Sequence, residues 1–160
     1  MTNRSSPGEP CGVPDGYEVR LLQRDDYQKG FKELLAQLSD VGDLSEECFL
    51  KVFDSRSQQV NSYRCVVVEH VESKCLVSTA TLLVEEKFLH GGARVGHIED
   101  VVTDSSHQRR GLARLVMSTL ASQAKDLGCY KIILDCKEEN AVVYERLGYR
   151  RCETQMRLDI

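Results

Sequence analysis

Hydrophobic residues recur with helical or strand-like spacing along most of the chain after residue 16. The clearest helical pattern covers 111–127, where apolar residues repeat at offsets of three and four while Arg114, Ser118 and Ser122 fall on the other side. Alternating or β-branched runs predict strands at 17–22, 63–70, 75–85, 95–103, 130–136 and 149–158. Helices are expected to begin at Asp25 or Asp26, after Ser45, at Gly111 and at Asn140.

These elements follow one another in the order β-α-α-β-β-β-α-β-α-β. The first half is rich in hairpins, and the second half is a β-α-β-α-β unit. The order predicts an α/β sandwich in which a mixed central sheet is flanked by helices. The run 130–136 is too apolar to alternate, so we expect it to be buried on both faces.

The chain has 160 residues, which suits a single domain. All three prolines lie within residues 1–16, together with three of the glycines. We therefore expect a flexible N-terminal arm over 1–16 and one domain over 17–160.

Charge and cysteine usage narrow the function classes. Lys and Arg total 21 against 25 for Asp and Glu, a net charge of −4, so a nucleic-acid-binding protein is not expected. There is no run long and apolar enough to suggest a membrane span or a secretory signal. The seven cysteines form no C-x-x-C pair, so we expect neither a disulfide framework nor a metal site. Reduced thiols favour an intracellular, cytoplasm-like compartment, with an organelle left open.

One segment carries the main chemical signal. Gln108, Arg109, Arg110, Gly111, Leu112 and Ala113 follow a predicted strand and begin the best helix. Free N–H groups at a helix start attract phosphate, and small residues allow close approach to the backbone. The plainer interpretation, a glycine at a helix start beside solvated arginines, is about equally good from composition alone. The chain has no Walker A or G-x-G-x-x-G motif, which disfavours a nucleoside triphosphate or dinucleotide site.

The spacing Q-x-x-G-x-A, with Asn140 and Tyr144 about thirty residues further on, resembles the acetyl-coenzyme A motif of the GNAT acetyltransferase superfamily. Longer blocks resemble the glucosamine 6-phosphate N-acetyltransferases within it. These blocks are K-F-L-H at 87–90, G-H-I-E-D-V at 96–101, G-C-Y-K-I-I-L-D-C at 128–136, N-A-V-V-Y-E at 140–145 and G-Y at 148–149. The likeness extends over most of the chain from about residue 17.

The resemblance implies a GNAT fold and transfer of acetyl from acetyl-coenzyme A to the amine of glucosamine 6-phosphate, a step towards UDP-N-acetylglucosamine. It implies direct attack in a ternary complex and a homodimer, with no metal. It implies that the cosubstrate is bound by Val101, Val102, Thr103, Gln108, Arg109, Arg110, Gly111, Leu112, Ala113, Arg114, Asn140, Tyr144 and Arg146.

The resemblance also assigns the acceptor side. The sugar phosphate is expected to contact Ser39, Lys87, Phe88, Leu89, His90, Glu99, Asp100, Tyr130, Lys131 and Asp135. Tyr144, Asp135 and Glu99 are the expected catalytic residues: Tyr144 protonates the leaving thiolate and Asp135 holds the amine. Glu99 and Asp100 are adjacent, so on a regular strand only one would face the cleft, and a bulge is expected to admit both.

Several alternatives stay open at this point. Taken singly, Lys87, His90 and Lys131 suit ordinary surface charges, Asp135 suits a turn cap, and Cys136 could be proposed as a nucleophile. With Arg94 and His97 nearby, however, Lys87 and His90 predict that one end of the strand is cationic. The family's C-terminal phosphate-binding cation is matched by Asp159, with Arg157 two residues earlier. A GNAT acting on a polyamine, a protein N-terminus or a lysine is the main rival, and a non-catalytic acyl-coenzyme A sensor ranks third.

Overall fold

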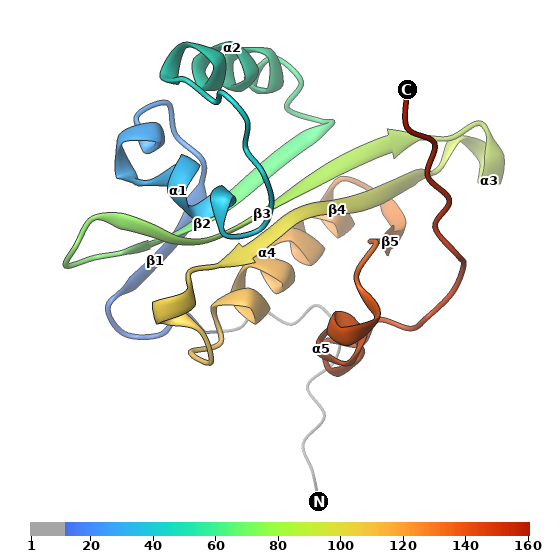
Figure 1. Ribbon diagram of the computed structural model, residues 1–160. Helices are drawn as coiled ribbons and strands as arrows, with labels where there is room; N and C mark the ends of the chain where they lie inside the picture. The colour runs from blue at the N-terminus through green and yellow to red at the C-terminus, as the bar shows by residue number, and fades with distance from the viewer. Residues whose placement is uncertain (1–11) are drawn as a thin grey trace, which may run out of the picture.

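A computed structural model describes residues 12–160, which form a five-stranded sheet with helices on both faces (Figure 1). The strands lie in chain order, β1 to β5, and neighbours are antiparallel except the parallel pair β4–β5. Their bounds are β1 Tyr17–Leu21, β2 Tyr63–His70, β3 Cys75–Glu86, β4 Arg94–Thr103 and β5 Cys129–Ile133. The predicted mixed sheet is confirmed.

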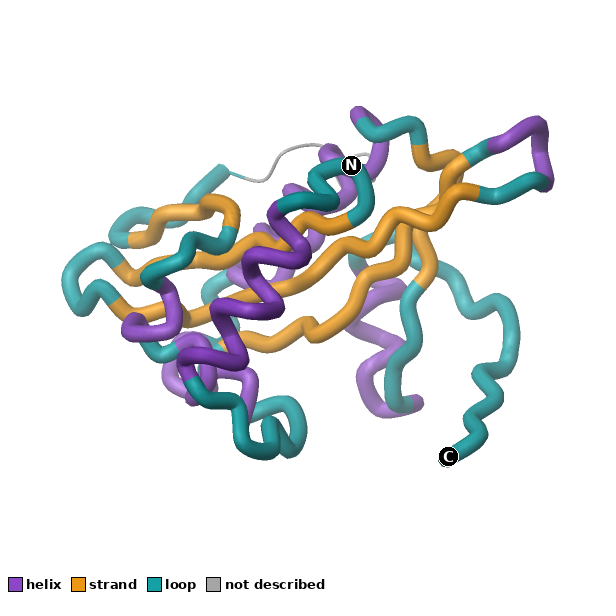
Figure 2. Tube along the Cα trace, turned by 90° about the horizontal axis from the view of Figure 1, so that it is seen from above, coloured by secondary structure: helices purple, strands orange, loops and turns teal. Residues whose placement is uncertain are grey.

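Two helical layers cover the sheet, and Figure 2, which views the molecule from above, shows helices in front of and behind the strands. One layer holds α1 Phe31–Ala36 and α2 Glu46–Ser57, and the other holds α4 Leu112–Asp126 and α5 Ala141–Arg146. The short elements are η1 Asp26–Lys29, α3 Leu89–Gly92, η2 Ser105–His107 and η3 Glu138–Asn140.

Strand alternation divides the core between these layers. Val66 and Val68 pack in the cluster that contains the buried face of α4, whereas Val67 packs with Phe31 and Phe49 of the α1–α2 layer. Successive side chains of a strand point to opposite faces, so β2 is buried on both. Its Val-rich sequence is typical of a central strand covered on each side.

Local sequence explains where the helices begin and end. The Ser45 hydroxyl accepts a 3.2 Å hydrogen bond from the Cys48 N–H, so the predicted cap of α2 is confirmed. The single helix expected from Asp25 or Asp26 is wrong, because Gly30 has a φ of +86° and separates η1 from α1. A left-handed residue cannot continue a right-handed helix.

One strand prediction and one burial prediction are wrong at the C-terminal side. The expected strand 149–158 is absent, and residues 149–160 run past the sheet without pairing to it (Figure 1). As a result β5 is an edge strand, and Tyr130 and Ile133 are 48% and 41% exposed rather than buried on both faces. An apolar run without a covering partner in its own chain cannot be buried on two sides.

The predicted arm 1–16 lies mostly outside the described residues, which begin at Gly12. At its end the Tyr17 N–H donates a 3.3 Å hydrogen bond to the Pro14 carbonyl as β1 starts. Across residues 12–160, every helix is too short or too polar to cross a bilayer.

Candidate active site

The sheet opens where β4 and β5 separate. The two strands pair from Arg94 opposite Cys129 to His97 opposite Ile133, and β4 then continues to Thr103 without β5 beside it. Ligands of α/β proteins collect at the carboxyl ends of strands where neighbours diverge. The predicted site residues Glu99 to Thr103 therefore line an open strand edge.

A β-bulge lies on this edge at Asp100, as expected from the sequence. Thr79 pairs with Val102 and Thr81 with Glu99, so two residues of β4 face one residue of β3. Asp100 has a φ of +55°, a left-handed conformation unusual for a residue with a side chain. Asp100 lines a cavity with Thr81 under α1 and α2, while Val101 packs with the α4 core on the other face.

The bulge brings three carboxylates into electrostatic reach of one another. Burial raises the pKa of Glu99 above its ordinary value, and the charges of Asp100 and Asp135 raise it further. Asp135 follows β5 and accepts a 2.9 Å hydrogen bond from the Gln155 amide. These groups form an anionic surface suited to a positively charged amine, and the assignment of the amine to Asp135 stays a prediction.

The predicted phosphate-binding segment 108–113 has an irregular backbone before α4. Arg109 and Gly111 both have positive φ, +61° and +81°, and Gly111 caps α4 without a side-chain hydrogen bond. The first N–H groups of Leu112, Ala113 and Arg114 therefore point away from any capping side chain. No atom lies within 4 Å of the position of a Gly111 Cβ, so a ligand can approach there. Gln108, Arg109 and Arg110 are exposed, and Arg110 donates a 3.2 Å hydrogen bond to the Tyr17 hydroxyl.

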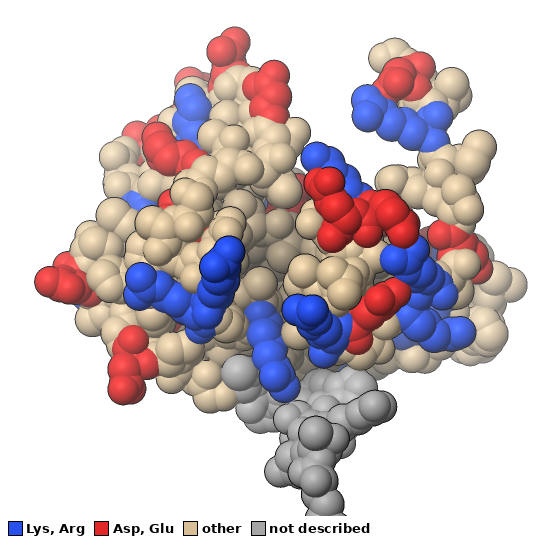
Figure 3. Space-filling model, turned by 60° about the horizontal axis from the view of Figure 1, so that its bottom comes forward, with Lys and Arg blue, Asp and Glu red and all other residues tan. Residues whose placement is uncertain are grey.

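Figure 3 brings the α4–α5 side forward and shows several Lys and Arg side chains in a band across it, with acidic side chains beside them. This mixture of basic and acidic side chains is consistent with the net charge of −4 for the chain. A local basic band of this kind can hold an anionic cosubstrate without a global positive field.

The second part of the predicted cosubstrate motif lies on and before α5. Asn140 is exposed directly before the helix, and Arg146 is exposed in its last turn. Tyr144 is partly buried, and its ring centroid lies 6.1 Å from that of Tyr149. Burial raises the pKa of Tyr144 and the nearby Cys136 raises it further, so the phenol keeps its proton at neutral pH.

The predicted sugar-phosphate residues come together from two distant segments. The His90 ring lies 4.9 Å from the Tyr130 ring, and Lys131 Nζ lies 5.6 Å from the same ring centroid. Phe88 and Leu89, on the connection between β3 and β4, are largely exposed.

The cationic patch expected between Lys87 and His97 is partly neutralised. Glu85 accepts a 2.5 Å hydrogen bond from Lys87 Nζ, and its other oxygen lies 2.9 Å from His97 Nε2. These contacts hold the pKa of Glu85 below its ordinary value. Arg94 donates to Glu86 at 2.8 Å. The expected cationic end is therefore partly balanced, because Glu85 lies two residues before Lys87 and near His97, and Glu86 pairs with Arg94.

Ser39 lies exposed just beyond α1, and its N–H donates to the Leu35 carbonyl at 3.2 Å. The nearby Gln37, which sequence reasoning missed, ties this end of α1 to the end of β4. Its amide donates to Asp104 at 2.7 Å and accepts from the Ser105 N–H at 2.9 Å. The link holds Ser39 on the same side of the sheet end as the open β4 edge.

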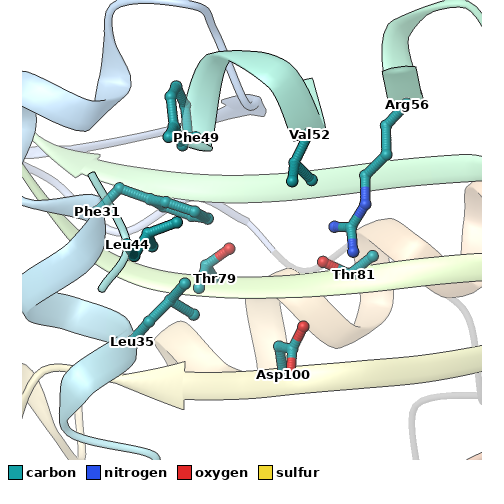
Figure 4. Close-up of a pocket in the computed structure, with 9 residues that line it drawn as sticks. All are labelled: Phe31, Leu35, Leu44, Phe49, Val52, Arg56, Thr79, Thr81 and Asp100. Atoms are coloured by element: carbon teal, nitrogen blue, oxygen red, sulfur yellow. The ribbon is translucent and has the colours of Figure 1, made fainter. Parts of the chain in front are cut away.

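A cavity of about 130 Å³ next to Asp100 was also missed by sequence reasoning (Figure 4). In Figure 4 the Arg56 guanidinium, from α2, and the Asp100 carboxyl, from β4, both point towards the region of Thr81. Arg56 also stacks over the Tyr63 ring at 5.0 Å. No local motif marks these residues, because helix α2 and the bulge meet only in the folded chain. Within residues 12–160, no three His, Cys, Asp or Glu side chains are grouped to hold a metal ion.

Comparison with known proteins places this geometry in a family. The model of the acetyltransferase (GNAT) family matches residues 20–149. The glucosamine 6-phosphate N-acetyltransferase of Arabidopsis thaliana is 39% identical over 149 residues, covering 90% of this chain and 97% of that protein. The corresponding enzyme of Candida albicans is 36% identical, covering 86% of this chain and 92% of that protein.

A solved structure agrees with the sequence matches. The crystal structure of the Arabidopsis thaliana glucosamine-6-phosphate N-acetyltransferase superposes with a TM-score of 0.87 at 36% identity, covering 89% of this chain and 97% of that one. The family match covers most of the chain, and it includes the bulged strand, the α4 loop and α5. The chain therefore belongs to the GNAT family of acetyltransferases.

Proposed function

We propose that this chain transfers the acetyl group of acetyl-coenzyme A to the amine of glucosamine 6-phosphate, giving N-acetylglucosamine 6-phosphate. The curated relatives with this activity align over nearly the whole chain. The observation that carries the proposal within the molecule is the approach of Glu99, Asp100 and Asp135 at the point where β4 and β5 separate. An ammonium group is attracted to such a cluster, and an acyl donor fits the neighbouring loop.

The α4 loop holds the pyrophosphate of the cosubstrate. Its free N–H groups and the positive end of the helix dipole stabilise the phosphate charge, and Arg109, Arg110 and Arg114 add cations. Asn140 and Arg146 extend the site along α5. The pantetheine arm then follows the open edge of β4 past Val102 and Thr103 towards Val101.

The amine attacks the thioester carbonyl directly. The N–C bond forms and the C–S bond breaks, while the amine proton passes to water or to the Glu99 carboxylate. Asp135 orients the amine. The Val101 N–H at the bulge stabilises the developing oxyanion, because a preorganised donor gains most when charge appears.

The leaving thiolate takes a proton from Tyr144. A partly buried phenol with a raised pKa is protonated at neutral pH and therefore available as an acid. No covalent intermediate is needed, since holding two substrates together supplies a large part of the acceleration. Cys136 takes no part in this mechanism.

The sugar phosphate is bound by Lys87, His90, Tyr130 and Lys131, with Phe88 and Leu89 beside them. Lys87 must exchange Glu85 for phosphate oxygens when the acceptor binds, while His97 keeps its contact with Glu85. Both interactions with Glu85 are partly exposed, so little stability is lost in the exchange. Arg157 forms a salt bridge with Asp159, with Nη2 2.5 Å from Oδ1. This salt bridge must break if Arg157 also contacts the phosphate.

The chain forms a homodimer in this proposal. Met156, Leu158 and Ile160 are 88%, 86% and 117% exposed and share one strand face by their spacing. Strand β5 presents an open edge at the same side of the molecule. A second copy of the chain that packs over the C-terminal segment and the β5 edge shields this apolar patch from water. Sedimentation at micromolar concentration should give the mass of two chains, and a monomer would overturn this part.

An acceptor panel tests the function. Acetyl-coenzyme A is incubated with glucosamine 6-phosphate, spermidine or a lysine-containing peptide, and acetylated products are measured by mass spectrometry. Product from the phosphosugar alone supports the proposal, and preferential product from either other amine overturns the acceptor assignment.

The six cysteines described are all free thiols, so we place the enzyme in a reducing cytoplasm.

A further inference from the structure

The cavity beside Asp100 lies next to the proposed reaction centre. It lies between the α1–α2 layer above and β3 and the β4 bulge below, and it is partly open to solvent (Figure 4). Asp100 is the neighbour of Val101, the proposed oxyanion donor. The cavity therefore begins one residue from the point where the thioester carbonyl is held.

Of the four substituents on the reacting acyl carbon, only one has no protein group assigned to it. A tetrahedral carbon carries sulfur, oxygen, nitrogen and an alkyl group. The sulfur lies towards Tyr144, the oxygen towards the Val101 N–H, and the nitrogen towards Asp135. The alkyl group is left, and the void next to Asp100 is available to receive it.

The walls of the cavity suit hydrocarbon. Most lining residues are apolar, namely Phe31, Leu35, Leu44, Phe49 and Val52. On the floor, the Thr79 hydroxyl already donates to the Val66 carbonyl at 2.9 Å, so it needs no ligand. Arg56 and Thr81 are the polar groups besides Asp100. The apolar part of this lining favours methylene groups, whereas Arg56, Thr81 and Asp100 make the β3–β4 side of the cavity polar.

The size of the cavity exceeds what an acetyl methyl needs. Its volume is about 130 Å³. An engineered apolar cavity of about 150 Å³ is large enough for benzene, so there is room here for a chain of a few carbons. A second groove of about 230 Å³ shares Phe31, Phe49 and Val52 with the cavity and extends it along α2.

We propose that this cavity is an acyl pocket and that the chain transfers propionyl and butyryl groups, as well as acetyl, from the corresponding acyl-coenzyme A thioesters. The proposal rests on the proposed function, because it uses the same acceptor amine. The chemistry balances in the same way: the amine nitrogen bonds to the acyl carbon and the C–S bond breaks. The nitrogen loses a proton to water or to Glu99, the thiolate takes one from Tyr144, and Tyr144 regains a proton from solvent.

Val52 offers a sharp test, because it lines the cavity and is 42% exposed, so a larger side chain there need not disrupt the core. Val71, in the turn after β2, is 43% exposed and lines neither cavity, which makes Val71→Phe a matched control. Acetyl-, propionyl- and butyryl-coenzyme A are each tested with glucosamine 6-phosphate, and kcat/KM is measured by mass spectrometry.

Wild type and Val71→Phe should give all three products. Val52→Phe should lower kcat/KM for butyryl-coenzyme A by about tenfold or more, because the pocket no longer holds the added methylenes. The loss for acetyl-coenzyme A in the same variant should be several-fold smaller, because an acetyl methyl fills much less of the pocket than a butyryl chain.

Acetyl transfer without any propionyl or butyryl transfer overturns the pocket and leaves the proposed function intact. Equal loss of all three donors in Val52→Phe overturns it as well. If no donor acylates the phosphosugar, the proposed acceptor is wrong. Calorimetric measurement of acyl-coenzyme A binding then tests the pocket independently of the acceptor. In that case wild type should bind butyryl-coenzyme A at least as tightly as acetyl-coenzyme A, and Val52→Phe should lose this preference. Unchanged preference in Val52→Phe would overturn the pocket.

Discussion

The side-chain amide of Gln155 donates a 2.9 Å hydrogen bond to the carboxylate of Asp135. The contact joins the C-terminal segment, which lies outside the sheet, to the residue proposed to hold the acceptor amine. Both residues are exposed, so the bond is in competition with water and with an incoming ammonium group.

Asp135→Asn should therefore lower kcat/KM for glucosamine 6-phosphate by about 10- to 100-fold, since a hydrogen bond to a charged group contributes about 1.5–3 kcal/mol. Acetyl-coenzyme A binding, measured by calorimetry, should not change. Gln155→Ala is the matched control, because it removes the neighbour and keeps the carboxylate. A larger defect in Gln155→Ala than in Asp135→Asn would contradict the assignment of Asp135.

Tyr144→Phe should lower kcat by about a hundredfold or more, as expected when a general acid is removed. The dissociation constant of acetyl-coenzyme A should change little, because the aromatic ring remains. Tyr149→Phe removes a neighbouring phenol and serves as the control. Cys136→Ser should keep full activity if transfer is direct. A strong loss in Cys136→Ser, with detection of an acetylated thiol in wild type, would favour a covalent route instead.

The pH dependence of kcat/KM should show the titration of the Glu99 carboxyl. Its pKa is raised by burial and by the charges of Asp100 and Asp135. The ionised form, which attracts the amine or takes its proton, therefore disappears at a higher pH than for an ordinary Glu. Activity should fall as pH drops through this raised pKa, and Glu99→Gln should abolish that acid limb. A limb that survives unchanged in Glu99→Gln would assign the titration to another group.

Asp26 should matter for stability rather than catalysis. It is fully buried and accepts hydrogen bonds from both Arg20 and the Gln23 N–H. Burial raises the pKa of Asp26, but the hydrogen bonds and charge of Arg20 outweigh it, so the pKa lies below its ordinary value. The corresponding stability is present above the unfolded-state pKa and is lost as pH falls through the lower folded-state value.

Asp26→Asn should lower the free energy of unfolding by about 3–5 kcal/mol, because it breaks a buried ion pair and leaves Arg20 without its main partner. Asp25→Asn changes the adjacent, largely exposed carboxylate and should have an effect below about 0.5 kcal/mol. Urea unfolding at neutral pH measures both. Similar values for the two variants would show that the buried pair does not stabilise the fold.

The sequence predicted the features that depend on neighbouring residues. Ser45 caps α2 through a local hydrogen bond, and the adjacent carboxylates Glu99 and Asp100 lie at a bulge, as expected. It also predicted correctly that the β4 strand, the α4 loop and α5 lie in the order typical of the family. Each of these signals is contained in a short stretch of chain.

Features that depend on long-range pairing could not be found in this way. The contact of Glu85 with His97 arises only because antiparallel pairing brings β3 and β4 side by side, whereas its contact with Lys87, two residues away, is local. Arg56 and Asp100 meet at one cavity from elements far apart in the chain. The apolar segments 130–136 and 149–158 both have strand propensity, yet pairing decides whether each is buried. The first became an edge strand and the second no strand at all.

The most direct test of the central claim compares two acceptors that differ only in phosphate. Acetyl-coenzyme A is supplied with glucosamine 6-phosphate or with glucosamine, and the N-acetylated product is measured by mass spectrometry. The account predicts efficient acetylation of the phosphosugar and little of the free sugar, with Lys87→Ala reducing this difference. Equal acetylation of both sugars, or product from neither while acetyl-coenzyme A still binds, would contradict it.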